Sequence, residues 1–302
     1  MSTPSEYFQA AVNAYRTGRL GDAESICLQL LQTNPLFLDV LSLLETVYSA
    51  QGRPAEIIPF YQKALSQARQ FIAVRSTNGG LQRLKTLGFR PQGILDIGAY
   101  EGEWMRMAKT VFPESKVLMV EAQPEKEPVL NAACKTYDGS VEYLIALLGQ
   151  SNQEAVPFFQ IRPPFGSTGS SVYEEQVAYK GRHLDRQVIA LKMIRLDDLL
   201  ASHSASHFQF IKLDVQGAEL DVLSGGSQIL NGAEAVLLEV SFLEYNKGAP
   251  QFADVVAFMN AKGFVVFDIL DCYREKKDIL IQSDILFVRT DSKLRPAGLI
   301  EL

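Results

Sequence analysis

Glycines and acids follow short apolar runs in this sequence, which is the pattern of a ligand site at strand ends. Residues 94–97 form such a run around Asp96, and Gly98 and Gly102 come next, before helical apolar spacing over residues 103–108. The pattern predicts a strand, a tight turn and a helix. Bare glycine backbone and unpaired helix N–H groups would then face a ligand, which suits a nucleotide-like cofactor.

A second acid, Glu121, closes the next apolar run, 23 residues after Gly98. An acid at about this distance hydrogen-bonds the ribose hydroxyls of an adenosine cofactor. A pyrophosphate needs the pattern G-x-G-x-x-G, but Tyr100 takes the place of its middle glycine. S-Adenosylmethionine carries no phosphate, so a looser turn flanked by acids can hold it. The residues predicted to bind the cofactor are Asp96, Gly98, Ala99, Tyr100, Glu101, Gly102, Glu121, Ala122 and Gln123.

The elements that would position these residues alternate between strands and helices. Strands are predicted over residues 93–97, 116–121, 141–147, 208–213, 235–240, 264–269 and 284–289, with helices over 103–111, 124–134 and 252–262 among them. Such alternation predicts a mainly parallel, doubly wound α/β sheet covered by helices on both faces. Ligands bind these sheets beyond the carboxyl ends of the strands, where the strand order reverses.

Residues 5–71 instead show helical spacing throughout and predict four helices. Gly18 and Gly52 are 34 residues apart, the period of tetratricopeptide repeats, and the segment resembles that family. It holds about two units, fewer than the roughly three needed for independent stability. We therefore predict a helical domain at residues 1–73 and a catalytic domain at 74–302. The helices are expected to dock a protein partner, to form a homodimer, or only to cap apolar surface.

The composition excludes several classes of function. The net charge is −6 and no dense basic cluster occurs, so nucleic acid is not an expected partner. No apolar run reaches the roughly 18 residues of a membrane span, and the N-terminus lacks the features of a signal peptide. We therefore expect a cytoplasmic protein. The three cysteines lie more than a hundred residues apart, which predicts reduced thiols.

The motifs, taken together, resemble those of the FkbM family of class I methyltransferases over residues 81–289. They occur in that family's order: Asp96-Ile97-Gly98-Ala99-Tyr100-Glu101-Gly102, Val120-Glu121-Ala122-Gln123-Pro124, Arg195-Leu196-Asp197-Asp198-Leu199, Ile211-Lys212-Leu213-Asp214-Val215-Gln216-Gly217-Ala218-Glu219 and Leu238-Glu239. The resemblance implies a Rossmann-like fold and S-adenosylmethionine-dependent methylation. The usual acceptor is a hydroxyl oxygen on a sugar, a polyketide or a similar small molecule or glycan.

Asp214 is the first candidate for the acceptor side, because it ends the strand that faces the methyl group in this architecture. Methyl transfer requires an aligned acceptor oxygen and removal of its proton, so Asp214 is expected to orient the acceptor or to act as base. Glu239, at the next strand end, and His183 are further catalytic candidates. Glu219 is expected either to cap a helix or to bind the acceptor. Asp214, Glu219 and Glu239 could also hold a divalent cation, but we predict no metal.

The insertion over residues 149–206 is expected to determine acceptor specificity. Within it, Ser170 and Ser171 precede a predicted helix at 172–175, which they would cap unless they line the acceptor pocket. Two other functions compete with methyl transfer. A nicotinamide-dependent dehydrogenase would bind NAD despite its irregular turn. An interaction scaffold with a vestigial fold would lack the strand-end acids, which are present here.

Overall fold

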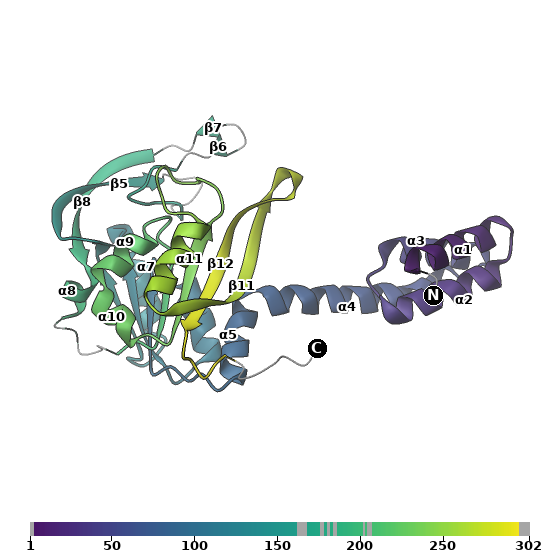
Figure 1. Cartoon of the computed structure of the whole chain (residues 1–302), viewed down its shortest axis with the longest axis horizontal. Coiled ribbons are helices and arrows are strands. Elements are labelled where there is room, and N and C mark those ends of the chain that lie inside the picture. The colour runs from purple at the N-terminus through teal and green to yellow at the C-terminus, as the bar shows by residue number, and fades with distance from the viewer. Residues whose placement is uncertain are drawn as a thin grey trace. The chain divides into compact units, whose positions relative to one another are not determined.

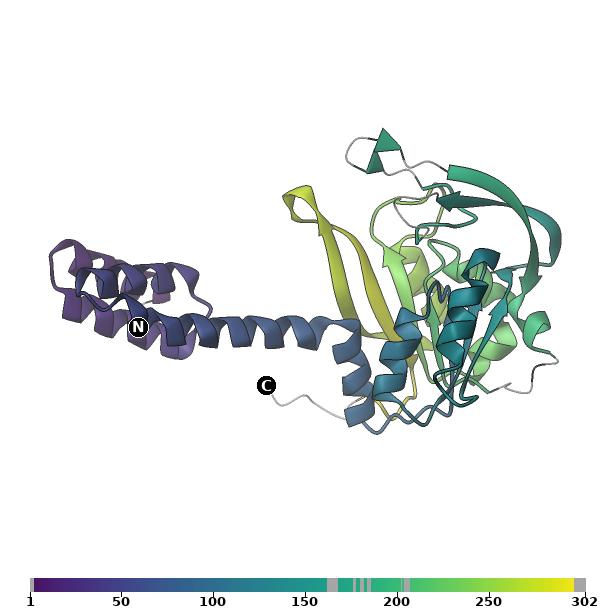
Figure 2. The same cartoon turned by 180° about the vertical axis from the view of Figure 1, so that it is seen from behind.

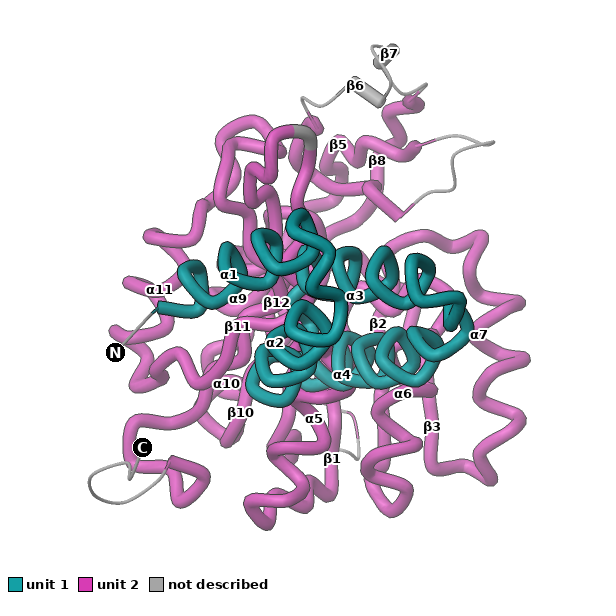
Figure 3. The backbone as a smooth tube through the Cα atoms, turned by 90° about the vertical axis from the view of Figure 1, so that its right-hand side faces the viewer, with its two compact units in different colours: residues 1–74 teal, residues 75–302 magenta. Residues whose placement is uncertain are grey.

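The computed structural model describes residues 3–161, 168–175, 178–179, 182–183, 186–201, 203 and 207–295, with the backbone alone at 178–179, 182–183 and 276. The chain divides into two compact units, residues 1–74 and 75–302, which are coloured separately in Figure 3. Among the described residues, no helix combines the length and the apolar character needed to cross a membrane.

The first unit consists of helices, labelled in Figure 1: α1 (Pro4–Arg16), α2 (Leu20–Thr33), α3 (Leu38–Ala50), the 3₁₀ turn η1 (Pro54–Ile57) and α4 (Ile58–Arg75). The predicted run of helices is thus confirmed. Ala11 and Ala23 are fully buried, and their small side chains let α1 and α2 pack closely. On α4, Ile58, Leu65 and Ile72 are exposed at a seven-residue spacing. The tetratricopeptide identity and the docking role stay predictions.

The second unit contains a seven-stranded sheet with the order β11-β12-β10-β9-β1-β2-β3. Its strands are β1 (Gly93–Ile97), β2 (Lys116–Glu121), β3 (Val141–Ile145), β9 (Phe210–Leu213), β10 (Ala235–Ser241), β11 (Phe264–Glu275) and β12 (Ile279–Arg289). The pairs from β3 to β10 are parallel, and β12 runs antiparallel to both of its neighbours. The chain builds outward from β1 to β3 and then returns to place β9 on the other side of β1. The order therefore reverses between β1 and β9, as the doubly wound prediction requires.

Helices cover both faces of this sheet, as Figures 1 and 2 show. They are α5 (Thr77–Thr86), α6 (Glu103–Val111), η2 (Pro124–Lys126) with α7 (Glu127–Cys134), α8 (Leu196–Leu200), α9 (Glu219–Gly225), α10 (Ser227–Gly232) and α11 (Phe252–Ala261). Neighbouring strand residues point to opposite faces. Ile94 and Phe210 pack with residues of α5, α6 and α7, whereas Leu95 and Ile211 pack with residues of α8 to α11. Both faces of the central strands are therefore core, which explains their continuous apolar runs.

The insertion forms structure of its own. Strands β4 (Leu147–Gly149), β8 (Arg186–Arg195) and β5 (Gln153–Ile161) make a separate three-stranded sheet, and β6 (Ala178–Tyr179) pairs with β7 (Arg182–His183). The strand predicted over 141–147 is divided at Ala146 between β3 and β4. The helix predicted over 172–175 is wrong. Residues 172 and 173 form a bend instead, between the bridge of Ser171 to Phe159 and the bridge of Glu175 to Asn246.

Candidate active site

The turn after β1 has an unusual backbone, in which Gly98, Tyr100 and Gly102 all adopt positive φ angles. The amides of Gly98 and Ala99 donate to the Val120 carbonyl of β2, at 2.9 and 3.2 Å. A Cβ atom on Gly98 would lie 1.8 Å from the carbonyl oxygen of Asp214. The glycine is therefore needed because the end of β9 crosses the turn there, a reason other than the ligand contact predicted from the sequence.

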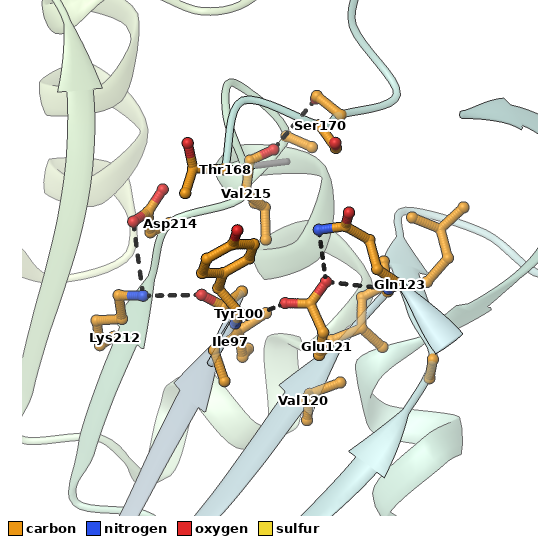
Figure 4. Close-up of a pocket in the computed structure, with 18 of the residues that line it drawn as sticks. Ile97, Tyr100, Val120, Glu121, Gln123, Thr168, Ser170, Lys212, Asp214 and Val215 are labelled. Atoms are coloured by element: carbon orange, nitrogen blue, oxygen red, sulfur yellow. Dashed lines mark hydrogen bonds and ion pairs between the residues drawn. The ribbon is translucent and has the colours of Figure 1, made fainter. Parts of the chain in front are cut away.

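Glu121, at the end of β2, connects the turn after β1 with the loop after β2. Its Oε2 accepts from the Tyr100 amide at 2.8 Å, and its Oε1 accepts from the Gln123 amide at 3.0 Å and the Gln123 side chain at 3.2 Å. The side chain is buried but lines the cavity (Figure 4). Glu121 therefore shapes the glycine turn as well as lining the cavity.

Asp96 lies behind the cavity. It is fully buried, and it does not line the space that its neighbours Ile97 to Glu101 enclose. Its Oδ1 lies 3.3 Å from the Nζ of Lys212 on β9. Burial raises the pKa of the Asp96 carboxyl, and the Lys212 ammonium opposes that shift. The structure thus gives Asp96 an ion pair inside the fold, whereas the sequence predicts a cofactor contact.

Asp214 does face the cavity, with its side chain about two-fifths exposed. Its Oδ2 lies 3.7 Å from the Lys212 ammonium, and its Oδ1 accepts from the side-chain amide of Gln216 at 2.8 Å. The same Gln216 nitrogen donates to Glu239 Oε2 at 2.6 Å. Glu239 consequently stands behind Gln216 and is not among the residues that line the cavity. Burial and the charges of Asp214 and Glu219 raise the pKa of Glu239 well above its usual value.

From the sequence alone, no role is predicted for Lys212 or Gln216. Lys212 is two residues before Asp214, a spacing that places both on the same side of a strand, so the signal was present. Gln216 adopts a φ of +56°, which is uncommon for a residue with a side chain and has no signature in the sequence. A strained non-glycine residue beside two carboxylates is typical of a functional site.

Glu219 begins α9 and faces the backbone before it. Its Oε1 accepts from the amides of Val215 and Gly217, at 2.9 and 3.2 Å. Both amides belong to the loop before α9, so Glu219 holds that loop, and it does not line the cavity. Burial raises the pKa of Glu219 to about 7, although these amide donors oppose the shift. Among the described residues, no group of three or more His, Cys, Asp or Glu side chains is arranged to hold a metal ion.

The titration of Glu219 predicts a pH-dependent stability. Because its pKa is raised from 4.5 to about 7 by folding, the neutral form stabilises the protein below pH 4.5 and this contribution is lost as the pH passes 7. The loss amounts to about 3 kcal/mol. Glu219→Gln keeps the acceptor oxygen and should remove this loss, so that urea unfolding at pH 8 shows a variant more stable than wild type. Exposed Glu114→Gln is the control, and parallel curves for wild type and Glu219→Gln would contradict the assignment.

Both predicted serines line the cavity, but their hydroxyls are engaged. Ser170 Oγ accepts from the Ile161 amide at 3.1 Å. Ser171 Oγ lies 2.9 Å from the carbonyl oxygen of Gln216 and accepts from the Tyr173 amide at 3.1 Å. Ser171 therefore attaches the insertion to the loop after β9, whereas Ser170 links two segments within the insertion. His183 lies on β7, and its side chain is outside the described part of the structure.

A cavity of about 260 Å³ lies at the carboxyl ends of β1, β2 and β9, and Tyr100, Glu121 and Asp214 are among the residues that line it. Part of the wall is apolar, and Phe158 and Val172 of the insertion contribute to it. The other apolar residues near this segment are Ala122, Ala146, Leu147 and Leu148. The charged residues of the wall are Glu101, Glu103, Glu121, Lys212 and Asp214. A cavity wall with both apolar side chains and several carboxylates suits a ligand in which an uncharged heterocycle is joined to a cationic group.

The strand order and the position of this cavity define the Rossmann-like class of methyltransferase folds. The sequence profile of the methyltransferase FkbM domain matches residues 96–266, more than half of the 302 residues. The chain therefore belongs to the FkbM methyltransferase family, which confirms that part of the resemblance. No curated protein sequence matches the chain at a significant level.

Several solved structures resemble the chain at low sequence identity. Precorrin-6y C5,15-methyltransferase from Geobacter metallireducens is 10% identical, over 68% of this chain and 84% of that one, with a TM-score of 0.39. An O-methyltransferase family protein from Burkholderia thailandensis is 9% identical, over 82% and 62%, with a TM-score of 0.40. The 1,6-didemethyltoxoflavin-N1-methyltransferase of the same organism, solved with S-adenosylhomocysteine, is 12% identical over 76% and 86%, with a TM-score of 0.37.

Proposed function

We propose that this protein transfers a methyl group from S-adenosylmethionine to a hydroxyl oxygen of a sugar, a polyketide or another small-molecule or glycan acceptor. The charge of the cavity wall carries the proposal. The described residues that line it contribute four carboxylates and one ammonium, Lys212, which is itself paired with Asp96 and Asp214. Carboxylates attract the sulfonium and amino groups of S-adenosylmethionine but repel the pyrophosphate of NAD.

The cofactor side of the cavity fits an adenosine. A carboxylate offers about four acceptor positions, and Glu121 uses three of them for N–H groups. One ribose hydroxyl can donate to the remaining acceptor position of Glu121. A second ribose hydroxyl would take the position at which the side-chain amide of Gln123 now donates to Glu121. The apolar wall around Leu148 and Phe158 would receive the adenine ring.

The acceptor side fits a hydroxyl group that must lose a proton. S-Adenosylmethionine, when bound, supplies a methyl group on a sulfonium leaving group. Asp214 is exposed to the cavity, and Lys212 and Gln216 hold it from two sides. We infer that Asp214 binds the acceptor hydroxyl and takes its proton as the new bond to carbon forms. Glu239, which lies behind Gln216, would keep that amide in place.

Calorimetric titration of the purified chain with S-adenosylhomocysteine and, separately, with NAD tests the cofactor. We expect S-adenosylhomocysteine to bind and NAD not to bind. Binding of NAD alone would favour a dehydrogenase. Binding of neither ligand to the folded protein would favour a scaffold role.

Glu121→Ala should weaken S-adenosylhomocysteine binding about 10- to 150-fold. The variant loses a ribose acceptor and the bonds that hold Tyr100 and Gln123, and a hydrogen bond to a charged group contributes about 1.5–3 kcal/mol. Titration calorimetry measures the change. Glu114→Ala is the matched control, since this exposed acid precedes the amino end of the same strand. Equal affinities of Glu121→Ala and wild type would remove Glu121 from the cofactor site.

A further inference from the structure

The Lys212 ammonium lies where the cofactor turn meets the end of β9. Its Nζ donates to the Gly98 carbonyl at 3.1 Å, and it lies 3.3 Å from Asp96 Oδ1 and 3.7 Å from Asp214 Oδ2. Figure 4 shows it reaching toward the turn on one side and toward Asp214 on the other. One buried cation thus contacts the end of β1, the glycine turn and the acid on the acceptor side.

Asp96 depends on this cation. It is fully buried, and among the described residues neither of its carboxylate oxygens has a hydrogen-bond partner. The ion pair with Lys212 is the polar contact that the structure gives it. A buried carboxylate without a counter-charge is unstable and takes up a proton or moves instead. Because Asp96 is two residues before Gly98, either response would disturb the turn.

Other charged groups also act on this pair. Lys212 faces Asp214 at the end of its own strand and Asp284 on β12, and it also opposes the charge of Glu239 on β10. Asp96 additionally experiences the charges of Asp214 and of Glu121 on β2. Burial alone would lower the pKa of Lys212, but Asp96 and Asp214 outweigh it and raise that pKa. The two carboxylates therefore favour the charged form of the lysine.

We propose that Lys212 is a positioning residue that ties the cofactor turn to Asp214, so that the shape of the cofactor site depends on this buried cation. The proposal rests on the proposed function, because it takes S-adenosylhomocysteine as the ligand of the turn. It assigns Lys212 no part in bond making. Its charge favours the ionised form of Asp96, and its contact with the Gly98 carbonyl sets the turn against β9.

Lys212→Met tests the proposal, because methionine fills similar space without the charge. Relative to wild type, the variant should bind S-adenosylhomocysteine at least about tenfold more weakly at about pH 8.5 and recover much of the loss at about pH 6, where Asp96 takes up a proton. Asp96→Asn/Lys212→Met removes both charges and should bind with the pH dependence of wild type. Lys109→Met is the matched control, since Lys109 is equally buried and donates to Pro113, Ser115 and Ser140 away from the cavity. It should leave that pH dependence unchanged.

Two outcomes would overturn the proposal. The first is that Lys212→Met binds S-adenosylhomocysteine as tightly as wild type at both pH values. The second is that Lys212→Met loses the same affinity at both pH values and that the double variant loses it too. If wild-type protein does not bind S-adenosylhomocysteine, the proposed function fails, and thermal unfolding of the same variants decides the role of Lys212. The midpoint of Lys212→Met should then lie further below wild type at about pH 8.5 than at about pH 6. The double variant should remove that difference, and a deficit that is independent of pH would overturn the proposal.

Discussion

Asp214→Asn should reduce methyl transfer about 100- to 10,000-fold, the range that a positioned proton acceptor contributes. The asparagine oxygen can still accept from Gln216, so the loop after β9 should keep its shape. S-Adenosylhomocysteine affinity should therefore change little. The measurement is transfer of a labelled methyl group from S-adenosylmethionine to the hydroxyl acceptor that is identified by a screen of sugars and polyketides.

Asp198→Asn is the control for this prediction. Asp198 is an exposed acid on α8 that accepts from the Asn152 side chain, and it does not line the cavity. It should leave the transfer rate unchanged. If Asp214→Asn transferred methyl groups as fast as wild type, the proton would have to leave by another route, and Asp214 would lose its assigned role.

Gly98→Ala should destabilise the protein by about 4 kcal/mol or more, at the upper end of single-residue effects. The new Cβ would lie 1.8 Å from a backbone oxygen of Asp214, and backbone cannot move aside as a flexible side chain can. Either β1 or β9 would have to shift, and both strands are buried along their whole length. Urea unfolding measures the change.

Gly139→Ala separates crowding from backbone strain. Gly139 has the same φ of +73° as Gly98, but a Cβ there would meet no atom within 4 Å. Its replacement should cost about 1 kcal/mol, from the left-handed backbone alone. Similar losses at both glycines would mean that the approach of β9 is not what requires Gly98.

The sequence predicts the central strands well. The predicted bounds of β1 and β2 agree with the structure, because each strand is a buried apolar run that ends at a glycine turn or an acid. The strands of the insertion are harder to predict. Strands β5 and β8 pair with each other although 24 residues separate them, and their apolar and polar residues do not alternate regularly. The helix predicted over 172–175 failed for the same reason: its bridges are made to Phe159 and Asn246, which are distant in sequence.

The candidate site shows a similar division. Glu121 and Asp214 line the cavity as expected, because strand ends meet at one edge of a parallel sheet. Asp96 does not, because it lies inside the fold beside Lys212, and a strand-end acid looks alike in sequence whether it faces solvent or a buried cation. Gln216 depends on a left-handed backbone and on Glu239 of another strand, neither of which is local information.

The separate sheet of β4, β5 and β8 bears on how this family could diversify. Its strands pair among themselves rather than with the seven-stranded sheet, so lengthening or shortening them breaks no ladder of the main sheet. Phe158 and Val172 nevertheless reach the cavity from this segment. Phe158 is almost fully buried with Leu147 and Met193, so a change at this position alters the wall of the cavity and the small core of this sheet together.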